Sequence, residues 1–414
     1  MSLELFINLK KSNPEMNKKI PISILSLFII ILHVKFLFGI DFHGRISNYI
    51  YSFEDSKTRT QVYQFVNFSA NAPEFANTTL NASLRALTDL NQSLDRDQRF
   101  KAYNLNLKFS RLFNRVDLTV GRQFFHPGTV LGGLDGLYAK FYITRKINFS
   151  AYGGVESNFQ RSFEIYKLKD SFTTGGLFEL NRTLSTNFQL FYLQKANEDD
   201  IYWQIAGLNL NNFMFKNTSF RLQAHYDLQN ERFHRLYFYA NHYLFDNKLA
   251  LSLNYKQQHP QIYANSYYTI FEVDPYNHYQ VGFSYNFMKN YFVNAQYRII
   301  RFDNAETANQ FFATVSNNNG SFGLLYESGY AGDQLSLIFD YAYTIMPQLL
   351  ASLNIDYSRY RTETIYEFEN QLANAVRLSY KFQRHWTVDL EYQWLTNRFK
   401  DQDSRILNYI NYQF

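Results

Sequence analysis

The sequence predicts an all-β protein, a single closed antiparallel transmembrane β-barrel of about 18–22 strands, and three observations support this prediction. Segments of about ten residues alternate apolar and polar side chains, the pattern of a strand with one apolar face. The connections between these segments alternate between short turns and longer polar loops. The chain also contains 41 Phe and 34 Tyr at a mean hydropathy of −0.36, so its aromatic residues lie among polar ones.

Composition excludes several classes of protein. The 414 residues include no cysteine, which excludes a disulfide scaffold and any thiolate metal site. The formal net charge is only +5, and no basic patch interrupts the chain, so the sequence gives no support for nucleic-acid binding.

The N-terminus predicts export. An apolar run from Ile20 to Ile40 follows the cationic pair Lys18-Lys19 and contains the small residue Gly39 near its end. This pattern is typical of a secretory signal peptide, and a retained membrane anchor is the alternative. We therefore expect residues 1–39 to form a signal peptide, with Met16 as an alternative start, and residues 40–414 to form one barrel domain. Cleavage after Gly39 would lower the net charge to about +2.

The alternating pattern continues to the C-terminus without a shift in composition. Apolar residues at Phe220, Leu222 and Ala224 alternate with polar ones at Arg221, Gln223 and His225. The same period of two recurs near residues 249–256, 279–287, 349–358 and 386–394. About 22 candidate strands can be counted, of which 78–87, 309–316 and 321–328 are weak. We expect 18, 20 or 22 strands, because an even number keeps both ends on one rim.

Two kinds of connection alternate along the chain. The short ones are expected at the periplasmic rim: 113–115, 145–146, 181–183, 246–248, 288–290, 346–348 and 383–385. The longer ones are expected on the extracellular side: 88–98, 156–170, 257–277 and 361–369. This asymmetry favours an outer-membrane barrel over a soluble β-sandwich, whose strands are commonly shorter.

The last strand carries an assembly signal. Ile410, Tyr412 and Phe414 occupy alternate positions, and the sequence given stops at the phenylalanine. This ending resembles the terminal signature of bacterial outer-membrane proteins. The resemblance implies that the barrel-assembly machinery is a partner. An ordinary last strand that happens to end in Phe is the alternative.

Charged residues on the polar face are expected to line a lumen. The predicted cations are Lys108, Lys140, Arg221, Arg235, Lys256, Arg298, Arg377 and Lys381. The predicted anions are Asp117, Glu179, Asp227, Asp340, Asp356, Asp389 and Glu391. Because the two sets nearly balance, neither strong anion nor strong cation selectivity follows. The alternative for each residue is a cross-strand pair that only solvates the wall.

The segment from Gly121 to Gly136 is the most distinctive. One strand ends in Gly121-Arg122-Gln123, a glycine-rich connection follows, and the next strand opens with Asp135-Gly136-Leu137. This arrangement resembles porin-like families, including alginate-export-type barrels, and the resemblance implies a channel without naming a solute. We expect the connection Phe124–Leu134 to fold inward as a constriction and to pack against tyrosines of the inner wall such as Tyr138 and Tyr142. An external loop is the alternative.

Arg122 has the parity of the lipid-facing residues Val116, Leu118 and Val120, which is a costly place for a guanidinium group. Two explanations are open. A bulge at Gly121 would turn Arg122 inward, or Arg122 would lie at the rim. With Gln123 and Asp135, Arg122 is a candidate pore residue, as are Lys108, Lys140, Arg221, Arg235, Arg298 and Arg377.

Signals for catalysis are weak. The nine histidines are scattered singly, without a metal-ligand spacing or a Gly-x-Ser-x-Gly elbow. His242 lies on an apolar face without an obvious catalytic partner. We predict a passive outer-membrane channel for small hydrophilic solutes, with no cofactor and with membrane lipid as a partner. The oligomeric state, monomer or homo-oligomer, is open. A barrel with a closed lumen, acting as a lipase-like enzyme or a structural protein, is the alternative.

Overall fold

The computed structural model describes residues 40–414 except 56, 75–76, 127, 129–131, 159–160, 162, 260–273, 305, 331, 363–365 and 399. The predicted signal peptide and most of the predicted 257–277 loop therefore lie outside the described residues. Cleavage after Gly39 stays a prediction.

The described chain forms 22 β-strands and one short helix, joined into a single sheet. The first eleven strands and the helix are β1 Asp41–Asp55, β2 Lys57–Ala72, β3 Thr78–Asp89, α3 Arg96–Arg99, β4 Phe100–Leu112, β5 Val116–Phe125, β6 Gly132–Tyr142, β7 Ile147–Glu156, β8 Phe172–Thr183, β9 Thr186–Ala196, β10 Ile201–Phe215 and β11 Thr218–Asp227. The others are β12 Arg232–Leu244, β13 Leu249–Gln258, β14 Tyr276–Met288, β15 Tyr291–Phe302, β16 Thr307–Ser316, β17 Gly320–Gly329, β18 Asp333–Met346, β19 Leu349–Arg361, β20 Glu369–Phe382, β21 Trp386–Asn397 and β22 Lys400–Gln413.

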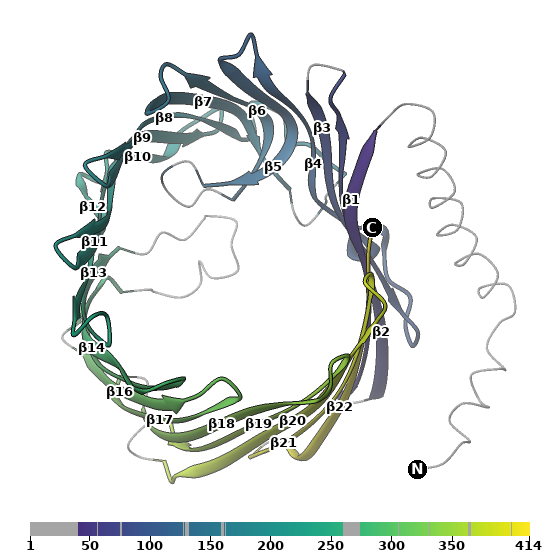
Figure 1. Ribbon diagram of the computed structural model, residues 1–414. Helices are drawn as coiled ribbons and strands as arrows, with labels where there is room; N and C mark the ends of the chain where they lie inside the picture. The colour runs from purple at the N-terminus through teal and green to yellow at the C-terminus, as the bar shows by residue number, and fades with distance from the viewer. Residues whose placement is uncertain are drawn as a thin grey trace, which may run out of the picture.

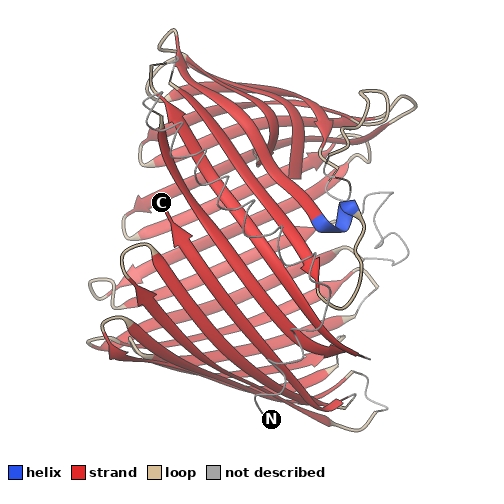
Figure 2. Ribbon diagram, turned by 90° about the vertical axis from the view of Figure 1, so that its right-hand side faces the viewer, coloured by secondary structure: helices blue, strands red, loops and turns tan. Residues whose placement is uncertain are grey.

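The sheet closes on itself. Each strand pairs antiparallel with the next one along the chain, and β1 also pairs with β22, from Arg45↔Gln413 to Ser52↔Ile406. Figure 1 looks down the resulting ring, and Figure 2 shows its strands steeply inclined to the barrel axis. The predicted all-β transmembrane barrel is confirmed, and the three weak candidates form β3, β16 and β17.

The ends of β1 and β22 lie together, because Gly44 and Phe414 exchange two backbone hydrogen bonds of 3.0 and 3.1 Å. We call this end of the barrel the terminal rim and the other end the loop rim. Turns at the terminal rim are short, whereas the loop rim carries the connections 90–99, 157–171 and 362–368. The predicted turn at 181–183 is wrong by two residues. The reversal occurs at Leu184 and Ser185, which both have positive φ, as a tight hairpin turn requires.

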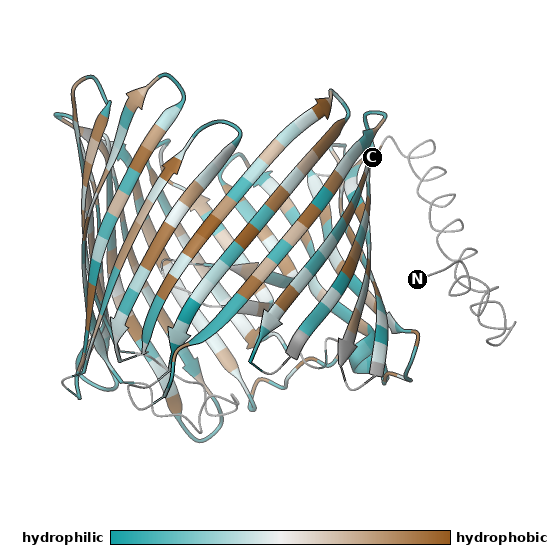
Figure 3. Ribbon diagram, turned by 90° about the horizontal axis from the view of Figure 1, so that it is seen from below, coloured by the Kyte–Doolittle hydropathy of each residue, from teal (hydrophilic) through white to brown (hydrophobic). Residues whose placement is uncertain are grey.

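The two faces of the wall differ as predicted. Apolar side chains are exposed on the outer face, and Figure 3 shows hydrophobic and hydrophilic residues alternating along the strands. Leu251 and Leu253 on β13, for example, are exposed on the outside, whereas Asn254 and Lys256 point into the ring. Among the described residues, no helix is long and apolar enough to cross a bilayer.

Candidate functional site: a shelf inside the barrel

Three glycines lie side by side where the β5–β6 hairpin leaves the wall. Gly121 on β5 opposes Gly136 on β6, which opposes Gly154 on β7. A Cβ atom at Gly136 would lie 2.3 Å from the carbonyl oxygen of Gly153, and one at Gly154 would lie 2.4 Å from that of Asp135. Gly121 has a φ of +115°, which L-residues rarely adopt. The neighbouring backbones approach too closely here for any side chain, so this glycine row allows the sheet to bend.

Beyond the glycine row, the hairpin crosses the inner wall. The Nδ2 atom of Asn209 on β10 donates a 2.6 Å hydrogen bond to the carbonyl oxygen of Gly128, 81 residues away in the chain. A Cβ atom at Gly128 would meet the ring of Phe191 on β9 at 2.4 Å. Because Asn209 and Phe191 both have the parity of the inner face, the hairpin reaches β9 and β10 through the lumen. Figure 1 shows β5 ending inside the ring. We call the described residues of this hairpin, 121–126, 128 and 132–136, the lumen shelf.

An apolar cluster fixes the underside of the shelf. Leu134 has no exposed surface and belongs to a buried cluster contributed by β6–β10: Leu134, Tyr152, Leu177, Phe191, Leu193, Trp203 and Ile205. Tyr138 packs against this cluster as predicted, whereas Tyr142 instead donates a 2.8 Å hydrogen bond to Asp117. The strands also run further than expected, because β5 extends to Phe125 and β6 begins at Gly132. The described part of the connection, His126 and Gly128, lies on the inner wall.

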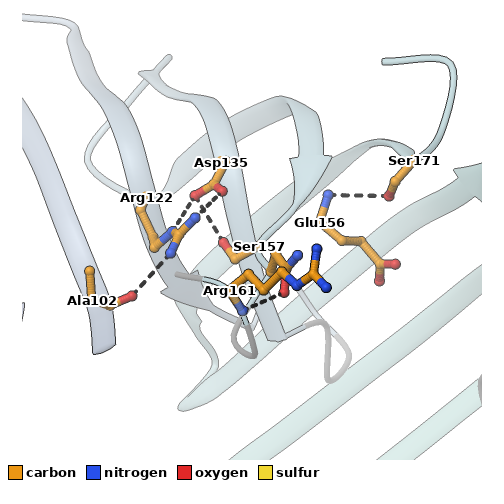
Figure 4. A network of polar contacts seen from close by, with 8 residues as sticks. Ala102, Arg122, Asp135, Glu156, Ser157, Arg161 and Ser171 are labelled. Atoms are coloured by element: carbon orange, nitrogen blue, oxygen red, sulfur yellow. Dashed lines mark hydrogen bonds and ion pairs between the residues drawn. The ribbon is translucent and has the colours of Figure 1, made fainter. Parts of the chain in front are cut away.

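The upper face of the shelf holds a buried ion pair. Arg122 donates from Nε and Nη2 to the two carboxylate oxygens of Asp135, at 2.7 and 2.6 Å. Its Nη1 donates to the carbonyl oxygen of Ala102, and Ser157 donates to Asp135 at 3.0 Å (Figure 4). The side chains of Arg122 and Asp135 are 7% and 6% exposed. This bidentate geometry is the strong form of a charge-assisted hydrogen bond.

The position of Arg122 differs from the first explanation offered by the sequence, a bulge at Gly121. The registers with β4 and β6 run through Gly121 without an inserted residue, so no register bulge turns Arg122 inward. Arg122 keeps the parity of Val120, but the bend at Gly121 removes it from the lipid-facing wall. The guanidinium group is therefore buried between strands and loop, near the loop rim. Gln123 points the other way, is buried beside Leu134, and its Nε2 has no hydrogen-bond partner among the described residues.

A second buried ion pair supports the wall under the shelf. Lys195 on β9 has no exposed surface, forms an ion pair with Glu156 on β7 and lies 4.7 Å from the ring centroid of Trp203. The other oxygen of Glu156 accepts a 3.0 Å hydrogen bond from the hydroxyl group of Tyr202. These residues were not predicted as a site. One sequence signal would have found them, because β9 and β10 carry apolar residues on the inward face, where a water-filled lumen requires polar ones.

The other candidate pore residues are spread around the ring. Lys140 pairs with Glu179, Arg377 lies 3.0 Å from Asp389, and Arg221 donates to Asn211. The remaining candidates follow with their neighbours: Arg298 beside Gln280, Arg235 over the ring of Tyr237, and Lys108 in register with Thr79 and Thr119. The structure therefore brings Arg122, Gln123 and Asp135 together in the shelf but does not gather the other cations into one ring.

The structure also places His242, the histidine considered for catalysis, and the residues of the assembly signal. His242 lies on the outer face close to the terminal rim, and its Nδ1 forms a 2.9 Å hydrogen bond with the hydroxyl group of Thr218. Within the described residues, no cluster of His, Asp and Glu has the geometry of a metal site.

At the assembly signal, Ile410 and Tyr412 face outward in register with Val388 and Trp386, and the ring of Phe414 stacks on Tyr412.

Comparisons with known proteins give structural similarities. No protein-family model matches the chain, and no curated protein sequence matches it significantly. The translocation pore of the P pilus usher PapC aligns with 90% of this chain and 99% of its own, with a TM-score of 0.50 and 8% identity. OccK5 of Pseudomonas aeruginosa aligns over 91% and 98%, with a TM-score of 0.42 and 11% identity. A BenF-like porin from Pseudomonas fluorescens Pf-5 aligns over 91% and 98%, with a TM-score of 0.44 and 8% identity. The likeness to the usher pore concerns the fold alone.

Proposed function

We propose that the protein is an outer-membrane channel for the passive diffusion of small hydrophilic solutes. The observation that carries this proposal is the polar inner wall of a closed 22-stranded barrel whose outer wall is apolar. Barrels of 16–18 strands already enclose an aqueous channel, and the lumen widens roughly linearly with strand number. An inner face of amides, hydroxyl groups and charges suits water in that lumen, because a lumen filled by side chains would need apolar packing throughout.

The lumen shelf is proposed as the constriction of this channel. It covers the inner wall of β7–β10 and so narrows the lumen from one side. Further round the ring from β10, the wall from β12 to β16 carries a recess of about 320 Å³ lined by uncharged residues that include Tyr239, Asn241, Ser252 and Gln296. Solutes would therefore pass beside the shelf, along this neutral polar wall.

Selectivity for ions is expected to be weak. Arg122, Lys140 and Arg377 each form an ion pair with a carboxylate, so their charges are largely compensated. Selectivity requires rings of uncompensated charge of one sign. The channel would discriminate mainly by solute size.

Export is the second part of the proposal. Removal of residues 1–39 as a signal peptide and insertion by the barrel-assembly machinery would place the barrel in the outer membrane of a Gram-negative-type bacterium. The intact mass of protein purified from outer membranes tests this step. A mature chain that still carries residues 25–38 would contradict it.

Bilayer recordings test the channel itself. The protein purified from outer membranes should give discrete conductance steps in a planar bilayer and a reversal potential close to zero in a salt gradient. Liposomes that contain it should swell in neutral sugars at rates that fall with sugar size. Intact, correctly inserted barrels that neither conduct nor swell would favour the closed-lumen alternative, an enzyme or a structural barrel.

A further inference from the structure

Three amide side chains face the membrane where the barrel closes. Asn48 on β1 is directly opposite Gln64 on β2, and Asn408 on β22 is directly opposite Ile50 on β1. They belong to the outer face, because Asn408 also opposes Leu390, which is 49% exposed there. We call Asn48, Gln64 and Asn408 the amide seam.

The amide seam lies at mid-height in the wall. In one direction, the successive cross-strand neighbours of Asn48 are Gln64 on β2, Ala86 on β3 and Phe100 on β4. Phe100 is the loop-rim end of β4, so this rim lies three strands away. Following the neighbours in the other direction reaches the terminal-rim end of β19 after four strands: Ile410, Val388, Tyr380 and Leu349. The seam is thus about equally far from the two rims, at the depth of the hydrocarbon core.

Hydrocarbon is a poor environment for these groups. Neither Asn48 nor Gln64 forms a side-chain hydrogen bond with any described residue, and the covered Oδ1 atom of Asn408 has no partner among them. An amide that loses water without gaining a partner is destabilised, and lipid offers no partner. The opposite wall has no such groups at this depth in its described strands, where Leu253 on β13 faces Val281 on β14.

A small residue flanks the seam. Ala86 on β3 faces outward in register with Gln64 on β2. Small side chains allow membrane-embedded surfaces to approach closely, and amides then form hydrogen bonds across the contact. An apolar surface with a polar centre is typical of a protein–protein contact in the membrane and unlike a surface that only meets lipid.

We propose that the amide seam is the contact surface for a second copy of this chain. An amide group is both donor and acceptor, so two identical seams related by a two-fold axis satisfy each other. The seam carries no charged residue, so no like charges would face each other across the two-fold axis. The contact leaves the lumen and its shelf untouched, so it is independent of the proposed channel activity.

Cross-linking in outer membranes tests this contact. The chain has no cysteine, so a single introduced thiol reports on one position. Asn48→Cys should give a product of twice the chain mass with a short bis-maleimide, and Leu253→Cys on the opposite outer wall is the matched control. We expect at least about tenfold more dimer from Asn48→Cys, because only a specific contact brings two copies of one position together.

A second variant tests the amides. In detergent, Asn48→Leu with Gln64→Leu should weaken self-association about tenfold, since several buried hydrogen bonds are lost, while the unheated band of the folded barrel persists in gels. Equal dimer yield from the two cysteine variants, or unchanged association of the double-leucine variant, would overturn the proposal. A cross-linked product of another mass would assign the seam to a different partner and would also overturn it.

Discussion

Removal of the Arg122 side chain should release the lumen shelf. Arg122→Ala leaves the Asp135 carboxylate, which is 6% exposed, without its bidentate partner. Removing one member of a buried ion pair costs about 3–5 kcal/mol, because the remaining charge stays buried and uncompensated. A change of this size shifts a local equilibrium by about 150-fold to about 5,000-fold. The barrel wall should survive, because its ladders do not depend on this pair.

Single-channel recording is the assay for this change. With the shelf displaced from β9 and β10, the conductance of Arg122→Ala should rise and its current noise should increase. Selectivity should shift toward cations, because Asp135 gains water and an uncompensated charge at the edge of the lumen. The control is Lys169→Ala, which removes a cation that is 59% exposed beside Glu198, itself 66% exposed. An exposed pair of this kind contributes little.

A double replacement distinguishes the effect of the two charges from the effect of the volume that the two side chains fill. Arg122→Met combined with Asp135→Leu fills a similar volume without charge, and such replacements of buried pairs are often neutral in stability. This double variant should therefore conduct more like the wild type than Arg122→Ala does. If Arg122→Ala has the conductance, noise and selectivity of the wild type, the pair does not hold the shelf and the reasoning fails.

Three further predictions concern the shelf and the strand ends. Leu134→Ala should weaken the packing of the shelf on the wall by about 2–5 kcal/mol, since it opens a cavity in the cluster, and should raise conductance in the same recordings. Deletion of residues within 129–134 should also raise conductance. Unchanged conductance in both variants would argue against a constriction. Gly136→Val should lower the yield of folded barrel on refolding in detergent, because its Cβ would lie 2.3 Å from a carbonyl oxygen. The control is Gly132→Val, where no atom lies within 4 Å of the added Cβ and only the positive φ is strained. Equal yields for the two variants would refute the close approach of the backbones. Deletion of Phe414 should reduce insertion in cells more than refolding in detergent, and normal surface levels would show that its position is coincidental.

Local patterns in the sequence were enough to predict the strands and their two faces. Alternation from Phe220 to His225 is a property of the extended backbone itself, so it predicts β11 without knowledge of any partner strand. Even the weak segments form strands, because each lies between neighbours that supply a hydrogen-bond ladder. The same reasoning predicted a constriction at residues 121–136 but left the position of Arg122 open between an inward bulge and the rim. Parity assigns a residue to a face, yet it gives no warning that the whole hairpin bends away from the wall.

The sequence by itself determined which segments form strands, to within a few residues at their ends, which side of each strand is apolar and which connections are short, since all of these follow from spacing within a few residues. The tertiary structure alone decided that 22 strands close into one ring and that Gly121, Gly136 and Gly154 lie in one row. It also decided that Gly128 meets Asn209, and that Asn48 lies near Asn408. The physical reason is that these contacts depend on the register between strands. Register is set by pairing along the whole ladder, and no single segment of the sequence contains it.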